Sequence, residues 1–204
     1  MYRWGIVVAA VFVFALVATQ VLLPSLAARA VEERLTERGG SADVTLGAIP
    51  ALRLLFSDGE RFEVEASELE LDVDEQVRVF ERLDGFALVD VSIADSHAGP
   101  IALSDFELSR DGVGPYNLTA SGEATVSELA TFGLEQLEVP GASLLDLLLD
   151  PFVEAVDGPV PIELDMELTS EDGRVRVVSG ESEIAGFAAG PLAELITSAI
   201  VVQL

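Results

Sequence analysis

The feature that most constrains the fold is an alternation of apolar and acidic residues that recurs along the chain. Its clearest example is VPIELDMEL, residues 160–168, where Glu163, Asp165 and Glu167 alternate with apolar side chains. Successive side chains of a β-strand point to opposite faces of a sheet, so this pattern predicts a strand with one apolar and one acidic face. The turn sequence Glu171–Asp172–Gly173 follows, which predicts a hairpin into the next strand.

The same alternation predicts further strands earlier in the chain. We expect them near residues 62–66, 69–73, 87–93, 101–108 and 116–120. The apolar parity slips at Ser67–Glu68 and again at Ser104–Asp105, which predicts a bulge or a tight turn at each place. Because sheets with one solvated face are typically antiparallel, a mainly antiparallel sheet is expected.

Segments with helical periodicity lie among these strands. They cover residues 74–83, 125–137, 143–156 and the stretch from Pro191 to the end of the chain. The segment 143–156 places Leu145, Leu148 and Phe152 on one face. An apolar sheet face needs a cover, and these helices would supply it. The sequence therefore predicts an α+β fold, a curved, mainly antiparallel β-sheet wrapped around amphipathic helices.

An uncharged segment precedes this body. No charged residue occurs from Trp4 to Ala28, and Gly5 to Leu23 is nearly all apolar. As a helix it would match the hydrocarbon core of a bilayer, about 30 Å thick. We predict that residues 1–28 are an N-terminal transmembrane anchor or signal and that residues 29–204 form one domain. The length of the apolar run favours a retained anchor over a signal peptide cleaved near Ser25–Leu26–Ala27.

The flanking charges bear on the orientation of this segment. Arg3 precedes it, whereas Arg29, Arg34 and Arg38 follow it. A count of basic residues alone would place the body on the cytoplasmic side. A short N-terminal apolar segment before a long domain is, however, the usual layout of an export signal-anchor. We therefore expect a single-pass protein of the cell membrane with its main domain extracytoplasmic.

Composition excludes several classes of partner and chemistry. The formal net charge is −25, and every one of the basic residues is Arg. Such an acidic chain would repel nucleic acid and anionic lipid surfaces, so any attraction to lipid must be mainly apolar. The sequence contains no Cys, which excludes thiolate nucleophiles, disulfides and thiolate metal sites.

Motifs for catalysis or metal binding are weak. The single His, His97, follows Asp95 and Ser96, but sequence neighbours rarely form a triad, so a solvated loop histidine is expected. The acidic run Asp72–Glu75 lacks the Gly and bidentate Glu of a calcium loop and is interpreted as a solvated strand end. The sequence also lacks a phosphate-binding Gly-rich loop. We predict no enzyme, no metal and no cofactor.

The most specific pattern lies in ADVTLGAIPALRLLFSDGERFEVEASELELD, residues 42–72. Here a predicted strand, a Gly-x-x-Pro turn at Gly47–Pro50, an apolar Leu-rich segment and a second strand follow one another. Together with the leading apolar segment and the closing AGPLAELITSAIVVQL, this resembles the LmeA family of phospholipid-binding proteins, formerly DUF2993, found mainly in actinobacteria. The resemblance implies an envelope protein that binds or transfers phospholipid in an elongated apolar groove, as tubular lipid-binding folds do.

On this interpretation, Ala51–Phe56 forms a short lipophilic helix or strand at the mouth of the groove, and Arg53 and Arg61 meet a phosphate. The expected lipid contacts are Leu52, Arg53, Leu54, Leu55, Phe56, Arg61, Phe62, Leu145, Leu148 and Phe152. The same leucines also suit an ordinary core, because a groove and a core share one composition. The acidic body offers no obvious site for an anionic headgroup.

Two other functions remain open. One is a structural or scaffolding envelope domain that presents its acidic face to a protein partner and has no lipid cavity. The other is a hydrolase with two carboxylates in a cleft, although nothing in the sequence selects a pair. A continuous apolar cavity long enough for an acyl chain would distinguish lipid binding from both.

Overall fold

The structure is a computed structural model that describes the chain except for residues 1, 72–78, 126–157, 172, 185–186 and 189–204; of residues 2–17 it describes the backbone. The described elements are α1 (Tyr2–Leu35), β1 (Ser41–Gly47), η1 (Ala51–Phe56), β2 (Gly59–Ser67), β3 (Glu70–Leu71), η2 (Val79–Glu81), β4 (Phe86–Ala98), β5 (Ile101–Asp111), β6 (Tyr116–Thr125), β7 (Pro159–Glu171), β8 (Arg174–Ile184) and β9 (Phe187–Ala188).

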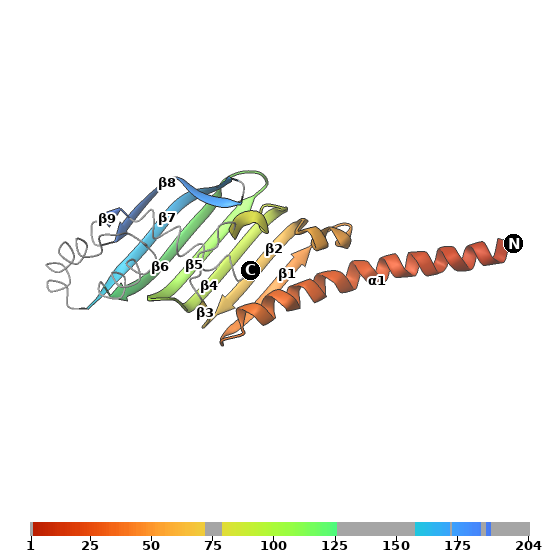
Figure 1. Cartoon of the computed structure of the whole chain (residues 1–204), viewed down its shortest axis with the longest axis horizontal. Coiled ribbons are helices and arrows are strands. Elements are labelled where there is room, and N and C mark those ends of the chain that lie inside the picture. The colour runs from red at the N-terminus through yellow and green to blue at the C-terminus, as the bar shows by residue number, and fades with distance from the viewer. Residues whose placement is uncertain (1, 72–78, 126–157, 172, 185–186, 189–204) are drawn as a thin grey trace, which may run out of the picture.

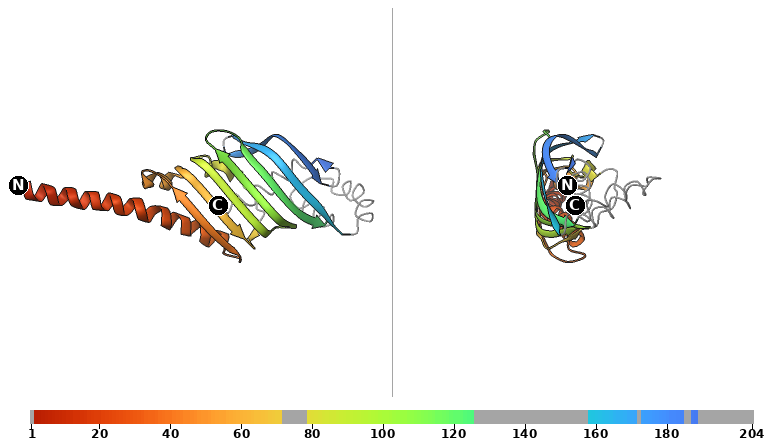
Figure 2. Two further views of the ribbon diagram at one scale, coloured as in Figure 1. Left: turned by 180° about the vertical axis from the view of Figure 1, so that it is seen from behind. Right: turned by 90° about the vertical axis from the view of Figure 1, so that its left-hand side faces the viewer.

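The strands form one open, curved sheet (Figures 1 and 2). It is nine-stranded in the order β1-β2-β4-β5-β6-β7-β8-β9, and β3 pairs with β4 outside this path. The strand pairs are antiparallel except for β2–β4 and β3–β4, which are parallel. The predicted α+β class with a mainly antiparallel, curved sheet is confirmed. The parallel pairs arise because β4 begins beside the first residue of β2, with Phe86 opposite Gly59, and then runs in the same direction as β2 and β3.

Both parity slips coincide with irregular backbone. Glu68 has a φ of +57°, and its N–H donates to the carbonyl of Ala94 at 3.1 Å, which ends β2 before β3 resumes beside β4. In β5 the register with β6 shifts between Leu103 and Asp105. Gly122 lies opposite this bulge, where a Cβ would come within 2.5 Å of the carbonyl oxygen of Ala102. The predicted bulge and turn are therefore confirmed.

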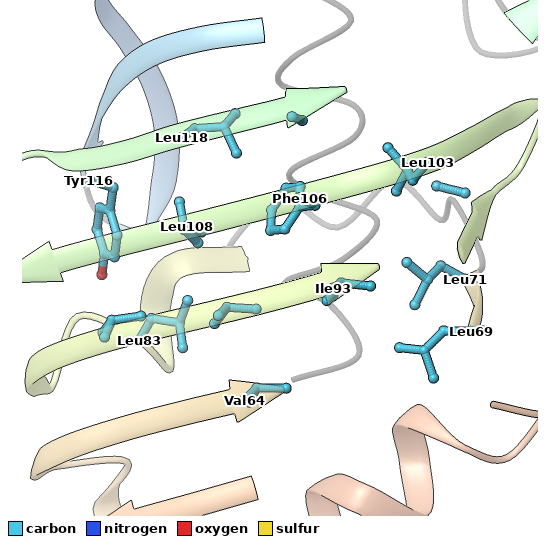
Figure 3. Close-up of a cluster of buried hydrophobic side chains, with 14 of the residues drawn as sticks. Val64, Leu69, Leu71, Leu83, Ile93, Leu103, Phe106, Leu108, Tyr116 and Leu118 are labelled. Carbon is cyan, nitrogen blue, oxygen red and sulfur yellow. The ribbon is translucent and has the colours of Figure 1, made fainter. Parts of the chain in front are cut away.

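The two faces of the sheet differ as the alternation predicted. In β7, Glu163, Asp165 and Glu167 are exposed while the apolar residues between them are buried. The buried side chains of neighbouring strands form one apolar layer, part of which is drawn in Figure 3. Its labelled members are Val64, Leu69, Leu71, Leu83, Ile93, Leu103, Phe106, Leu108, Tyr116 and Leu118.

Helix α1 runs without a break through Pro24 and lies along the β1 edge of the sheet (Figure 1). Near its end Ala28 and Leu35 join the core, and the chain leaves the helix through Gly39 and Gly40, both with positive φ. The helix itself ends at Leu35, and a turn over residues 36–38 leads to the glycine pair. Among the residues that the structure describes, no helix meets the length and apolarity needed to cross a membrane. The transmembrane segment within residues 1–28 stays a prediction from the sequence.

Most of the predicted covering helices lie outside the described residues. These are the segments 125–137, 143–156 and 191–204, and with them the expected lipid contacts Leu145, Leu148 and Phe152. Of the predicted helix over 74–83, the structure describes only the end. There η2 forms a single turn, and Phe80 and Leu83 are fully buried.

Candidate functional site

Exposed apolar side chains gather where η1 packs against α1. On the η1 side, Ile49, Leu52, Leu55 and Phe56 form a surface that we name the apolar tip; Phe56 is 82% exposed, Ile49 72% and Leu55 64%. On α1, Val21, Leu22 and Leu26 are also exposed. Figure 1 shows η1 beside the helix, at the end of the sheet from which α1 projects. On the surfaces of soluble proteins, large apolar side chains usually occur singly. Their concentration in one segment therefore marks a candidate interaction site.

The geometry of η1 explains why its side chains divide between core and solvent. A 3₁₀-helix has three residues per turn, so residues three apart lie on one side. Ala51 and Leu54 fall on the inner side, where Ala51 is fully buried and Leu54 packs against the core. Leu52 and Leu55 fall on an outer side. Ser57, in the left-handed conformation with φ of +52°, ends the helix and directs the chain into β2.

Gln20 of α1 holds the start of η1 in place. Its Nε2 donates to the carbonyl oxygen of Ala48 at 2.7 Å, and its Oε1 accepts from the N–H of Ala51 at 2.8 Å. A side-chain amide is costly in apolar surroundings unless it is hydrogen-bonded, and here both ends of the amide are used. The sequence analysis missed this residue. The signal that could have found it is that Gln20 is the single side-chain amide between Trp4 and Ala28.

The two arginines expected to meet a phosphate are both paired with carboxylates. Arg53 donates to both carboxylate oxygens of Asp58, at 2.9 and 2.7 Å, and lies 3.5 Å from Glu60. These hydrogen bonds from Arg53 hold the pKa of Asp58 below its usual value. Arg61 contacts Glu63 at 2.9 Å. Neither arginine is free in this structure, and a phosphate would have to displace a carboxylate from either one; exposed ion pairs of this kind are weak.

The expected lipid contacts divide between the tip and the core. Leu52, Leu55 and Phe56 lie together on the apolar tip, with Arg53 in the same helix. Phe62, by contrast, is buried in the core, where its ring meets Phe86 edge-on at a centroid distance of 5.3 Å. Alternation along β2 turns Phe62 toward the apolar face and Arg61 toward solvent.

The histidine motif does not assemble a nucleophile. His97 lies in strand β4 rather than in the predicted loop, and its side chain is exposed as predicted. Ser96 points to the opposite face, where its buried Oγ donates to the carbonyl of Ala94 at 2.8 Å and accepts from the N–H of Leu69 at 2.9 Å. Strand geometry therefore separates the hydroxyl from the imidazole.

The acidic face of the sheet carries a shallow hollow of about 210 Å³. Its lining includes Asp43, Glu63, Glu65 and Asp90. The strand register places Asp43 opposite Glu65 and Glu63 opposite Asp90, so like charges lie side by side. Within the described ranges, no three acidic or histidine side chains are arranged to hold a metal ion. This face is too polar for an acyl chain and carries the wrong charge for an anionic headgroup.

Comparison with known proteins adds no relative. No protein-family model, no curated protein and no solved structure matches this chain. The chemistry assigned to the apolar tip therefore rests on its own residues.

Proposed function

We propose that the chain is a membrane-anchored, extracytoplasmic protein of the cell envelope that binds or transfers phospholipid, as its resemblance to the LmeA family implies. The observation that carries this proposal is the apolar tip, whose side chains are exposed and whose backbone is bound by Gln20 of an uncharged helical segment. Lipid is a partner that suits both the apolar tip and the uncharged helical segment, because acyl chains bury apolar side chains and require no charge.

The anchor in this proposal is α1. The helix is continuous from Tyr2 to Leu35, and its sequence carries no charge between Trp4 and Ala28. With Gly5–Leu23 in the hydrocarbon region, strand β1 would be the strand nearest the membrane and β9 the farthest, since α1 packs on β1.

The proposed acyl-binding surface is the apolar face of the sheet. It begins in β1 and β2 with Val44 and Val64 and continues through Phe106, Leu118 and Met166, all of which are buried in the core. Among the described residues, the buried charge on this face is Arg110, at the end of β5. Each methylene removed from water contributes about 0.8 kcal/mol, so an acyl chain that reached these side chains would bind appreciably. Arg53 and Arg61 are the cations that the resemblance assigns to a headgroup, and each would have to exchange its carboxylate partner for the phosphate.

Native mass spectrometry of the full chain, released from mild detergent, tests this proposal. We expect phospholipid to remain bound in a defined stoichiometry. A peptide of residues 1–40 is the matched control, because it keeps the helix and lacks the sheet. Lipid on the full chain but not on the peptide supports binding by the domain. A full chain that carries no more lipid than the peptide would rule out the sheet as a lipid site.

A second candidate function is a scaffolding domain with an acidic interaction face. The observation that favours it is the row of carboxylates around the hollow lined by Asp43, Glu63, Glu65 and Asp90. A partner for this face would be a basic protein surface. A chain that is membrane-bound, binds no lipid through its sheet and is retained by a basic partner in a salt-sensitive way would favour this function over the first.

A further inference from the structure

We propose that the apolar tip inserts into the surface of the bilayer and fixes how the sheet stands on the membrane. The occupant of this surface is lipid, at the boundary between headgroups and acyl chains. The inference rests on the proposed function in one respect, that α1 anchors the chain in a membrane. It does not require that the sheet bind lipid.

The depth of the tip follows from the position of Gln20 along α1. Gln20 lies inside the apolar run Gly5–Leu23, and its amide binds the backbone of Ala48 and Ala51 directly. The first charged residue beyond it is Arg29, roughly 13 Å further along the helix at 1.5 Å per residue. The backbone at the start of η1 is thus held level with Gln20, in the last helical turn of the segment expected in the hydrocarbon. It lies before Arg29, the first charged residue along the helix.

The side chains at this depth are apolar on both elements. Phe56, Ile49 and Leu55 project from the tip with most of their surface uncovered, and Val21 and Leu22 adjoin Gln20 on the helix. Fully burying one such side chain is worth about 1.5–3 kcal/mol. Monotopic segments bind membranes by burying side chains of this kind about 5–10 Å deep.

The charges beside the tip suit the headgroup region rather than oppose insertion. Arg53 forms a two-point ion pair with Asp58 and lies 3.5 Å from Glu60, so its positive charge is compensated, and the Ser57 turn separates the Asp58 carboxylate from Phe56. The pair lies at the C-terminal end of η1, where the chain turns into β2. A paired guanidinium and carboxylate at the edge of an apolar surface form the polar rim expected where a protein meets the bilayer surface.

Because the chain contains no Cys, single labels test this inference directly. An environment-sensitive fluorophore is placed on Phe56→Cys in the full chain, reconstituted into phosphatidylcholine vesicles. We expect blue-shifted emission, quenching by lipids that carry a spin label high on the acyl chain, and several-fold weaker quenching by aqueous iodide than at a control site. The control is Val113→Cys, because Val113 is a fully exposed apolar side chain in the turn between β5 and β6.

Flotation of the same vesicles separates the possible failures. A chain that floats while its Phe56 label responds to iodide as Val113 does would overturn the inference and leave the anchor intact. A label shielded from iodide but not quenched by spin-labelled lipid would also overturn it, because the tip would then be covered by protein. A chain that does not float overturns the anchor and the inference together. Lipid binding by the sheet is measured independently by mass spectrometry.

Discussion

Arg110 brings a charge into the buried end of β5. Its Nη1 lies 3.3 Å from a carboxylate oxygen of Asp84, and its Nη2 donates to the carbonyls of Leu83, at 3.0 Å, and Phe86. The guanidinium also stacks over the ring of Tyr116, 4.4 Å from its centroid. Within the described residues, the Nε is the one buried side-chain nitrogen or oxygen without a partner. The guanidinium therefore joins the segment before β4 to strands β5 and β6.

Replacing Arg110 with Met should destabilise the sheet. The change keeps much of the side-chain volume but removes the hydrogen bonds from Nη2 to the carbonyls of Leu83, Asp84 and Phe86 and the ion pair with the Asp84 carboxylate, at a cost of about 2–4 kcal/mol. Urea denaturation of the full chain in mild detergent, followed by circular dichroism, measures this cost. Arg176→Met is the matched control, since Arg176 makes an exposed pair with Glu171 at 2.9 Å and should change little. Equal stability of the two variants would contradict a structural role for Arg110.

Tyr116 should resist ionisation in the folded chain. Burial raises the pKa of its phenol, the positive charge of Arg110 lowers it, and Asp84, which accepts its O–H at 3.0 Å, raises it again. A folded pKa above the unfolded value of about 10 means that stability is fully present below that pH and is lost as pH rises beyond it. The chain has two tyrosines, so Tyr2→Phe isolates the signal.

Ultraviolet absorbance of the phenolate is the measurement. In the Tyr2→Phe chain we expect phenolate to appear only together with loss of the circular dichroism signal of the sheet. The urea-unfolded chain is the control and should titrate near the ordinary value of about 10. Phenolate formation near that pH in the folded protein would show that the ring is not shielded from solvent as the structure has it.

At the scale of elements, alternation predicted the strands because it records which side of each strand is buried. It also located the irregular backbone at Glu68 and at the Ser104–Asp105 bulge, since a bulge shifts parity by one residue. Parallel pairing of β2 with β4 could not be predicted, because alternation encodes a face and not a partner strand. The attachment of η1 to α1 could not be predicted either, because Gln20 forms hydrogen bonds with backbone groups 28 and 31 residues away.

The candidate site illustrates the same limit. Leu52 and Phe62 are both apolar residues of one predicted contact set, yet one lies on the tip and the other in the core. Composition cannot separate them. The three-residue period of η1 and the two-residue period of β2 do, once the backbone is known.

Removing the amide of Gln20 should loosen the tip. In Gln20→Leu the carbonyl of Ala48 and the N–H of Ala51 lose their partners, so amides of residues 48–57 should exchange with deuterium faster while strand β4 is unchanged. Hydrogen exchange by mass spectrometry measures this. Ser25→Ala is the control, because the Ser25 hydroxyl bonds only within α1, to the carbonyl of Leu22 at 2.9 Å. If both variants exchange like the parent, η1 is held by packing alone.

At the scale of the whole molecule, the net charge is strongly negative, and many of the acidic side chains lie on one face of the sheet. The net charge is −25, and exposed acids recur along the outward faces of β2, β4, β5 and β7. Hydroxyl side chains separate some of them, as where Ser92 lies between Glu65 and Glu107 in the register. Others oppose each other directly, as Asp43 does Glu65. Repulsion within such a face opposes the compact state of the sheet.

Screening this repulsion should stabilise the protein. Raising the salt concentration from about 10 mM to about 150 mM shortens the screening length from about 30 Å to about 8 Å, so repulsion across strands weakens and the melting temperature should rise.

Glu65→Gln removes one charge opposite Asp43 and should stabilise the sheet by about 0.5 kcal/mol at low salt. Glu123→Gln is the matched control, because its register partners are Ala102 and Pro161. Thermal melts of the three chains at both salt concentrations make the comparison. If Glu65→Gln melted at a lower temperature than the parent chain, the Glu65 carboxylate would stabilise the sheet. Repulsion between Glu65 and Asp43 would then not be the dominant effect of this charge.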